Sequence, residues 1–144
     1  MTPSDERIAR ALLETRTIAL VGASMKPDRP SNRVGTYLAS VGYRVIPVNT
    51  GHVGKTLFGQ TVVGRLSDIK DDVQMVDIFR NSEDALPVVE EALASLKGLR
   101  VIWMQLGIEN TEARRLAEAK GLMVFENRCT ASEHRRLLTR AHSA

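Results

Sequence analysis

The residues with the clearest chemical potential follow a short apolar run at residues 18–21, which is typical of a buried strand. The run ends at Gly22, a loop of small residues that includes Ser24 comes next, and Ser31 is the expected cap of a helix. Glycine lets a ligand approach the backbone, and the free N–H groups at a helix start attract an anion. Strand, glycine turn and helix start in this order therefore predict a phosphate-binding loop.

The charge pattern beside this loop also favours an anionic ligand. The formal net charge of the whole sequence is only +3, but residues 29–67 contain no Asp or Glu and carry +5. The basic residues of that segment are Arg29, Arg33, Arg44, Lys55 and Arg65. Lys26 and Arg29 lie within the loop itself and could reach a phosphate beyond the helix end. A local positive field next to a helix start is what a polyphosphate favours.

The length and composition indicate an ordinary soluble domain. The 144 residues are 43% hydrophobic and 26% charged, and we expect one domain over residues 1–144, with residues 1–16 as an N-terminal helix packed on it. The single cysteine, Cys129, excludes an internal disulfide. No secretory signal opens the sequence, and no apolar run approaches the roughly 20 residues that cross a bilayer. We therefore expect a cytoplasmic protein without membrane or nucleic-acid partners.

Apolar runs alternate with helical patterns along the sequence. Strands are predicted at residues 18–21, 44–48, 73–79, 101–104 and 122–125. Helix caps are predicted at Ser4, Ser31, Ser82, Asn110 or Thr111, and Thr130, the last in a capping box with Glu133. The glycine-rich residues 50–64 predict a loop with one short strand. This alternation predicts an α/β fold with a parallel five-stranded sheet and helices on both of its faces.

Polar, small or basic residues follow each predicted strand. Ligands of such sheets bind outside the carboxyl ends of the strands, near the point where the strand order reverses. The five segments at these ends are Gly22–Ser24, Pro47–Asn49, Phe79–Asn81, Gln105–Gly107 and Glu126–Arg128. We expect them to meet at one edge of the sheet.

A nicotinamide dinucleotide is the obvious ligand, and the residues argue against NAD. The glycine fingerprint G-x-G-x-x-G is absent, because Ala23 and Ser24 follow Gly22. An NAD site also needs Asp or Glu at the end of the second strand, where this sequence has Asn49. NADP tolerates that residue, so an NADP-linked oxidoreductase subunit stays open as an alternative.

Six motifs in preserved order carry a resemblance to a known family. They are VGAS (21–24), RPSNRVGTYL (29–38), GYRVIPVN (42–49), VDIFR (76–80), VIWMQLGI (101–108) and ENRC (126–129). With them the sequence resembles the small single-domain coenzyme A-binding proteins, which are similar to the N-terminal domain of the succinyl-CoA synthetase alpha subunit. The resemblance implies a Rossmann-like, doubly wound fold that binds coenzyme A (CoA), with no reaction assigned to most members.

The resemblance also implies which residues would contact CoA. They are Gly22, Ala23, Ser24, Lys26, Arg29, Arg33, Pro47, Asn49, Phe79, Arg80, Gln105, Gly107 and Asn127. The loop at residues 22–24 would lie against the pyrophosphate, with Ser24 donating through its hydroxyl. Asn49 would avoid the repulsion that an acid would exert on the 3′-phosphate. The segment from Gln105 to Gly107 would line the path of the pantetheine arm.

The sequence supports no catalytic or metal-binding assignment. Asp77 and Glu126 have no apparent His or Ser partner, and no histidine stands at metal-ligand spacing from other ligands. Cys129 follows Arg128 and precedes a helix start, so its thiolate could form a mixed disulfide with the CoA thiol. The functional hypotheses are a protein that binds CoA or an acyl-CoA, the NADP-linked subunit, and a CoA-responsive regulatory or interaction module.

Overall fold

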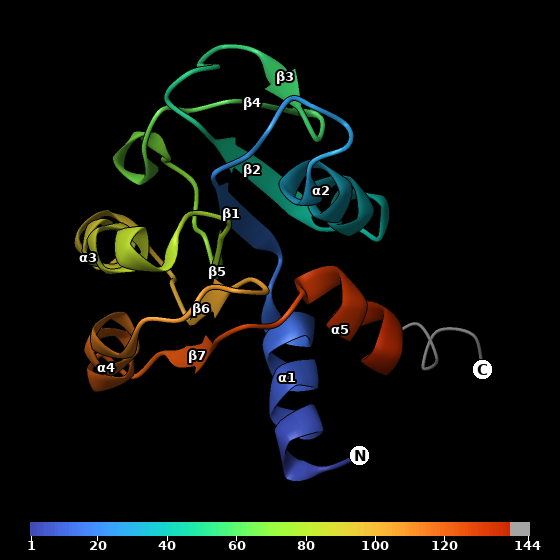
Figure 1. The fold of residues 1–144 in the computed structure, drawn as a ribbon, viewed down its shortest axis with the longest axis vertical. Coiled ribbons are helices and arrows are strands. Elements are labelled where there is room, and N and C mark those ends of the chain that lie inside the picture. Colours follow the sequence, from blue (N-terminus) through green and yellow to red (C-terminus); the bar gives the residue numbers. More distant parts are fainter. Residues whose placement is uncertain (139–144) are drawn as a thin grey trace.

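A five-stranded parallel sheet forms the centre of the computed structural model, which describes residues 1–138 (Figure 1). The strands are β1 (Thr17–Val21), β2 (Arg44–Val48), β5 (Met75–Ile78), β6 (Val101–Met104) and β7 (Met123–Phe125). Their order is β2-β1-β5-β6-β7, and every neighbouring pair runs parallel. The predicted α/β fold with five parallel strands is confirmed; residues 139–144 of the predicted domain lie outside the described residues.

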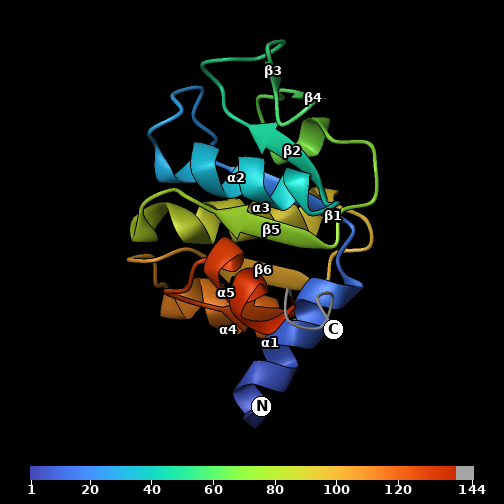
Figure 2. The same ribbon diagram turned by 90° about the vertical axis from the view of Figure 1, so that its right-hand side faces the viewer.

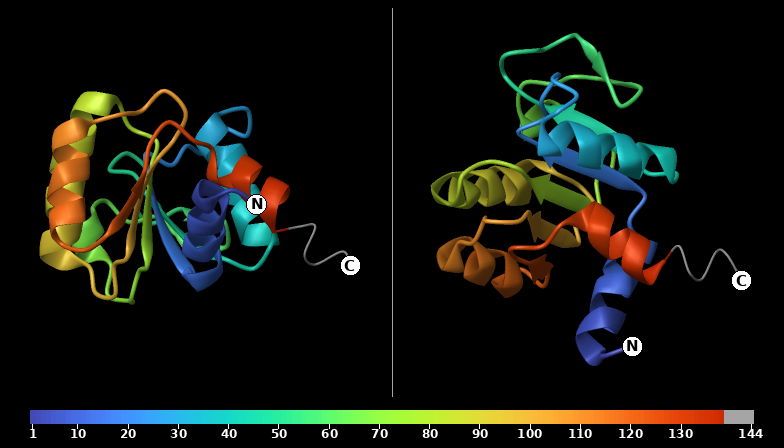
Figure 3. Two further views of the ribbon diagram at one scale, coloured as in Figure 1. Left: turned by 90° about the horizontal axis from the view of Figure 1, so that it is seen from below. Right: turned by 45° about the vertical axis from the view of Figure 1, so that its right-hand side comes forward.

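Helices cover both faces of this sheet, as the view from below shows (Figure 3). The helices are α1 (Pro3–Glu14), α2 (Pro30–Ser40), α3 (Ala85–Ser95), α4 (Thr111–Ala119) and α5 (Thr130–Leu137), with short 3₁₀ turns η1 (Leu66–Asp68) and η2 (Ser82–Asp84). Helices α3 and α4 pack into one apolar core, and α1, α2 and α5 pack into a second core on the opposite face. None of the described helices is long and apolar enough to span a membrane.

The period-two alternation of β5 divides its side chains between the two cores. Val76 and Ile78 belong to the core under α3 and α4, whereas Met75 belongs to the core under α1, α2 and α5. Asp77 therefore points to the same face as Met75, and it is fully buried there. The fold thus places one carboxyl group inside the sheet face that carries α5.

The predicted helix caps Ser4, Ser31 and Ser82 are wrong. Ser82 begins the 3₁₀ turn η2, so Asp84 is the N-cap residue of α3. The other two caps are displaced by prolines. Helix α1 is capped by Thr2, not Ser4, because Pro3 occupies the first helical position, where proline is favoured. Helix α2 begins at Pro30 for the same reason, so Arg29 is its N-cap residue and Ser31 lies inside the first turn. The hydroxyl of Ser31 is then available for the glycine loop.

The segment between β2 and β5 contains a small hairpin in addition to the loop that the sequence predicts. Its strands are β3 (Thr56–Leu57) and β4 (Gln60–Thr61), so the prediction of one short strand is wrong by one. Phe58 and Gly59 form a two-residue turn with φ values of 57° and 75°. The hairpin lies beyond β2 and α2 (Figure 2), and a Cβ added to Gly35 of α2 would overlap the Phe58 ring.

Gly35→Ala tests whether this ring fixes the hairpin on α2. Alanine normally stabilises a helix interior relative to glycine, but here we expect a loss of about 1–3 kcal/mol because the methyl group overlaps Phe58. Urea unfolding of the wild type, both single variants and Gly35→Ala/Phe58→Ala measures the coupling. In the Phe58→Ala background, Gly35→Ala should be neutral or stabilising; equal destabilisation in both backgrounds would contradict the contact.

Candidate functional site

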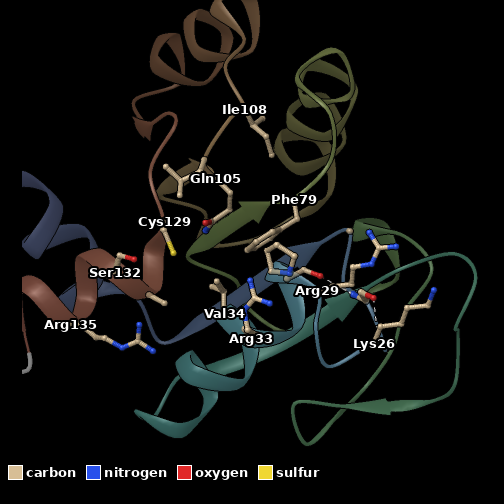
Figure 4. A pocket seen from close by; sticks show the side chains of 16 residues that line it. Lys26, Arg29, Arg33, Val34, Phe79, Gln105, Ile108, Cys129, Ser132 and Arg135 are labelled. Atoms are coloured by element: carbon tan, nitrogen blue, oxygen red, sulfur yellow. Dashed lines mark hydrogen bonds between the residues drawn. The ribbon is translucent and has the colours of Figure 1, made fainter.

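A cavity of about 840 Å³ lies at the carboxyl ends of β1, β5 and β6, between α2 and α5 (Figure 4). The chain leaves β1 towards β2 on one side and later returns past β1 to form β5 on the other. The cavity therefore lies where the strand order reverses, which is the position at which sheets of this kind bind their ligands. The predicted site residues that line it are Gly22, Ser24, Lys26, Arg29, Arg33, Phe79 and Gln105.

Gly22 is required at this point by both conformation and space. Its φ is +90°, in the region that side chains other than glycine rarely adopt. A Cβ there would also lie 3.2 Å from the carbonyl carbon and oxygen of Phe79. The absent side chain lets the main chains after β1 and β5 pass close together at the cavity wall.

The backbone N–H groups of the glycine turn are already used within the protein. Gly22 and Ala23 both donate to the Val48 carbonyl oxygen, at 3.1 and 3.3 Å. At the start of α2, the N–H groups of Asn32 and Arg33 both donate to a single backbone carbonyl, that of the N-cap residue. An anion in the cavity would therefore be held mainly by side chains, and less by the free backbone donors that the motif suggests.

Ser24 organises the loop in front of α2. Its N–H donates to the Ser31 hydroxyl at 3.0 Å, and its carbonyl accepts from the Asn32 side-chain amide at 2.9 Å. The Ser24 hydroxyl accepts from the Lys26 N–H at 3.1 Å, which leaves the hydroxyl hydrogen able to donate to a ligand. The loop is thus tied to the helix before any ligand enters.

The cavity is lined by positive charge. Its basic residues are Lys26, Arg29, Arg33 and Arg135, and no Asp or Glu is among the described residues that line it. The Arg33 guanidinium donates to the Asp28 carbonyl, and the Arg135 guanidinium lies 4.2 Å from the centre of the Tyr37 ring. A cationic cleft with apolar walls favours an anionic ligand.

A buried polar cluster lies behind the cavity. The Gln105 amide nitrogen donates to Asp77 Oδ1 at 2.6 Å and to Thr130 Oγ1 at 2.8 Å, and the Thr130 hydroxyl donates to Asp77 Oδ2 at 2.8 Å. Because its hydroxyl serves Asp77, Thr130 does not cap α5; Cys129 is the N-cap residue, and the predicted capping box with Glu133 is wrong. Burial raises the pKa of Asp77 to about 7, although both hydrogen bonds lower it.

Two predicted site residues, Asn49 and Arg80, line a neighbouring cavity of about 570 Å³ that shares Gly22 and Phe79 with the first. The Asn49 side-chain amide donates to the Ala23 carbonyl at 2.6 Å, and its oxygen accepts from the Gly51 N–H at 2.8 Å. The Arg80 guanidinium pairs with the Asp84 carboxylate at 3.5 Å.

The remaining predicted residues line neither cavity; they are Ala23, Pro47, Gly107 and Asn127. Ala23 is buried, and Pro47 lies in the edge strand β2, where its carbonyl accepts from the Val63 N–H at 3.0 Å. The Asn127 side chain accepts from the Gly107 N–H at 2.7 Å, which ties the loop after β6 to the loop after β7. Their contribution to binding stays a prediction.

The start of α5 supplies a cavity wall of which the sequence connected only Cys129 with the ligand, through the mixed-disulfide hypothesis. Cys129, Ala131, Ser132 and Arg135 all line the cavity. No periodicity shows which face of a sheet a final helix will cover, and the strand-end rule reaches only as far as residue 128. The mixed-disulfide hypothesis for Cys129 stays a prediction, although the thiol does lie in the cavity wall.

The fold and the position of the cavity define a Rossmann-like α/β domain whose cavity, lined by basic residues, lies where the strand order reverses. The chain belongs to the CoA binding domain family, which it matches over residues 16–135. This confirms the family that the motifs of the sequence indicate.

Several relatives share the whole domain. The chain is 35% identical over 132 residues to the uncharacterized protein YneT of Bacillus subtilis (strain 168), covering 92% of this chain and 95% of that protein. The structure of cell-free ID.343 from Thermus thermophilus is 36% identical with a TM-score of 0.87 and covers 96% of this chain and 100% of its own. A hypothetical protein from Pyrococcus horikoshii OT3 is 39% identical with a TM-score of 0.86, covering 96% and 93%.

Asp77→Asn tests the burial of the carboxyl group behind the site. The folded protein keeps a proton on Asp77 at pH values where the unfolded chain, with an ordinary pKa of 3.8, has released it. The free energy of unfolding of the wild type therefore falls as the pH rises from about 4 to 7. Relative to the wild type, the variant should gain on the order of 3 kcal/mol between pH 5 and 8.

Urea unfolding at four pH values in that range measures the difference, with Asp68→Asn at an exposed position as the control. If the free energies of unfolding of the wild type and of Asp77→Asn differ by the same amount at all four pH values, Asp77 does not titrate in this range.

Proposed function

We propose that this protein binds coenzyme A or an acyl-CoA in the cavity between α2 and α5, without catalysing a reaction on it. The observation that carries the proposal is the cavity itself: it lies at the strand-order reversal, and it has four basic residues and no acid among its described lining residues. CoA carries a pyrophosphate and a 3′-phosphate, so it matches this charge. Membership of the CoA binding domain family supports the same ligand.

The two neighbouring cavities suggest how a ligand as long as CoA would lie. The pyrophosphate would be near the Ser24 hydroxyl and the guanidinium of Arg33, because both residues line the larger cavity. The pantetheine arm would run along the apolar wall that Ile108 and Ala131 form. The adenosine 3′-phosphate would point to the smaller cavity, whose charged lining residues are Arg65, Arg80 and Glu91.

The chemistry of the lining residues favours binding over catalysis. Among the described residues that line the larger cavity there is no histidine and no carboxylate, so no general base faces the ligand. Asp77 is fully buried behind Gln105, and the His134 ring nitrogen Nδ1 lies 2.8 Å from the Tyr37 hydroxyl. Cys129 is the one nucleophilic thiol in the wall.

Isothermal titration calorimetry with CoA, 3′-dephospho-CoA and NADPH tests the proposal. We expect CoA to bind, 3′-dephospho-CoA to bind more weakly because it lacks one phosphate, and NADPH to give no heat. Native mass spectrometry of freshly purified protein would identify a retained ligand directly. Binding of NADPH without binding of CoA would replace the proposal with the NADP-linked subunit.

Arg33→Ala tests the contact with phosphate. Loss of a charge-assisted hydrogen bond should raise the dissociation constant for CoA about tenfold to a hundredfold. Arg115→Ala is the matched control, because Arg115 is exposed on α4, away from both cavities. Thermal unfolding without ligand checks that neither variant is damaged. Unchanged affinity in a folded Arg33→Ala protein would remove Arg33 from the site.

A further inference from the structure

Gln105 presents an unusual combination of burial and access. Its exposed fraction is 4%, yet it lines the larger cavity. Figure 4 shows its amide pointing from the end of β6 into the space between Cys129 and Phe79. The amide nitrogen donates to Asp77 and Thr130, so both of its hydrogens are used. The carbonyl oxygen Oε1 has no partner among the described residues.

The hydrogen-bond network determines which end of this amide faces Asp77. Above its pKa of about 7, Asp77 is ionised and can only accept hydrogen bonds, so at such pH values the group 2.6 Å from Asp77 Oδ1 is the NH₂ end of Gln105. The single hydrogen of the Thr130 hydroxyl goes to Asp77 Oδ2, and the Thr130 oxygen therefore accepts from Gln105. Turning the amide over would place two acceptor oxygens against each other.

We propose that Asp77 is a positioning residue that holds Gln105 with its carbonyl oxygen facing the cavity, where it accepts a hydrogen bond from an amide N–H of the ligand. This inference rests on the proposed function, since the pantetheine arm of CoA carries two secondary amide N–H groups. Thr130 completes the arrangement and joins it to α5, the helix whose first residues also line the cavity. The site would thus select a hydrogen-bond donor at this point.

Hydrogen exchange of the Gln105 side chain tests the orientation without any ligand. NMR of ¹⁵N-labelled protein at pH 8.5, where Asp77 is ionised, follows the two amide hydrogens, which are assigned by their loss in Gln105→Met. We expect both to exchange slowly in the wild type and faster in Asp77→Asn, because asparagine can offer either an oxygen or an NH₂ group to Gln105. The Gln60 side chain, whose amide oxygen accepts from Arg44, is the internal reference.

Calorimetry at the same pH tests the bond to the ligand, using CoA and two analogues in which one or the other pantetheine amide N–H is replaced by an ester oxygen. We expect one analogue to bind the wild type about tenfold more weakly than CoA, because its oxygen would face an acceptor. Gln105→Met should bind CoA more weakly and lose this discrimination, Asp77→Asn should reduce it, and Gln60→Met should keep it.

The outcomes separate this inference from the proposed function. If CoA binds but both analogues bind equally well, the ligand hydrogen bond is wrong and CoA binding stands. If CoA does not bind, the proposed function fails, while exchange still reports the orientation of Gln105. Wild-type hydrogens that exchange as fast as those of Gln60 overturn the positioning role, as does a folded Asp77→Asn protein with unchanged protection and discrimination. If Asp77→Asn does not fold, the exchange rates of the Gln105 amide hydrogens in the wild type test the orientation. The binding of CoA and its analogues to Gln105→Met then tests the hydrogen bond to the ligand.

Discussion

The close approach of two main chains at the ends of β1 and β5 is the constraint on which the site depends. The Phe79 N–H donates to the Val21 carbonyl at 2.9 Å, so the pairing of the two strands continues one residue beyond β5. Gly22 then turns away with φ +90°, and the missing side chain leaves room for the Phe79 backbone. From this point the segment after β1 runs to α2 on one face of the sheet, and the segment after β5 runs to α3 on the opposite face. Their divergence opens the space that the cavity occupies.

Much of the architecture could be predicted because it follows from local patterns. Apolar runs bounded by glycine and polar residues located all five strands, and their alternation with helical patterns indicated a parallel sheet. Hydroxyl side chains were less predictable, because a serine or threonine before a helix can cap it or bond elsewhere. Ser31 bonds to the loop and Thr130 bonds to Asp77. Both partners come from other elements, and sequence spacing cannot reveal them.

The charge pattern shows the same limit. The acid-free segment indicated a positive field, and two of its cations, Arg29 and Arg33, do line the larger cavity. Arg44, however, lies at the opposite end of β2 and pairs with Asp71 at 3.0 Å. Another cation of the larger cavity, Arg135, lies in α5, far from the acid-free segment in sequence. A linear run of charge therefore predicts the sign of the field more reliably than its sources.

The edge of the sheet at β2 has a consequence for behaviour at high concentration. Pro47 has no N–H to offer, its carbonyl is taken by Val63, and the Val63 carbonyl in turn accepts from the Asn49 N–H at 2.8 Å. The other edge, β7, is only three residues long. Within the described residues, neither edge presents a long row of free backbone groups to another molecule. The domain is thereby protected against edge-to-edge aggregation, which is the hazard that open sheets carry.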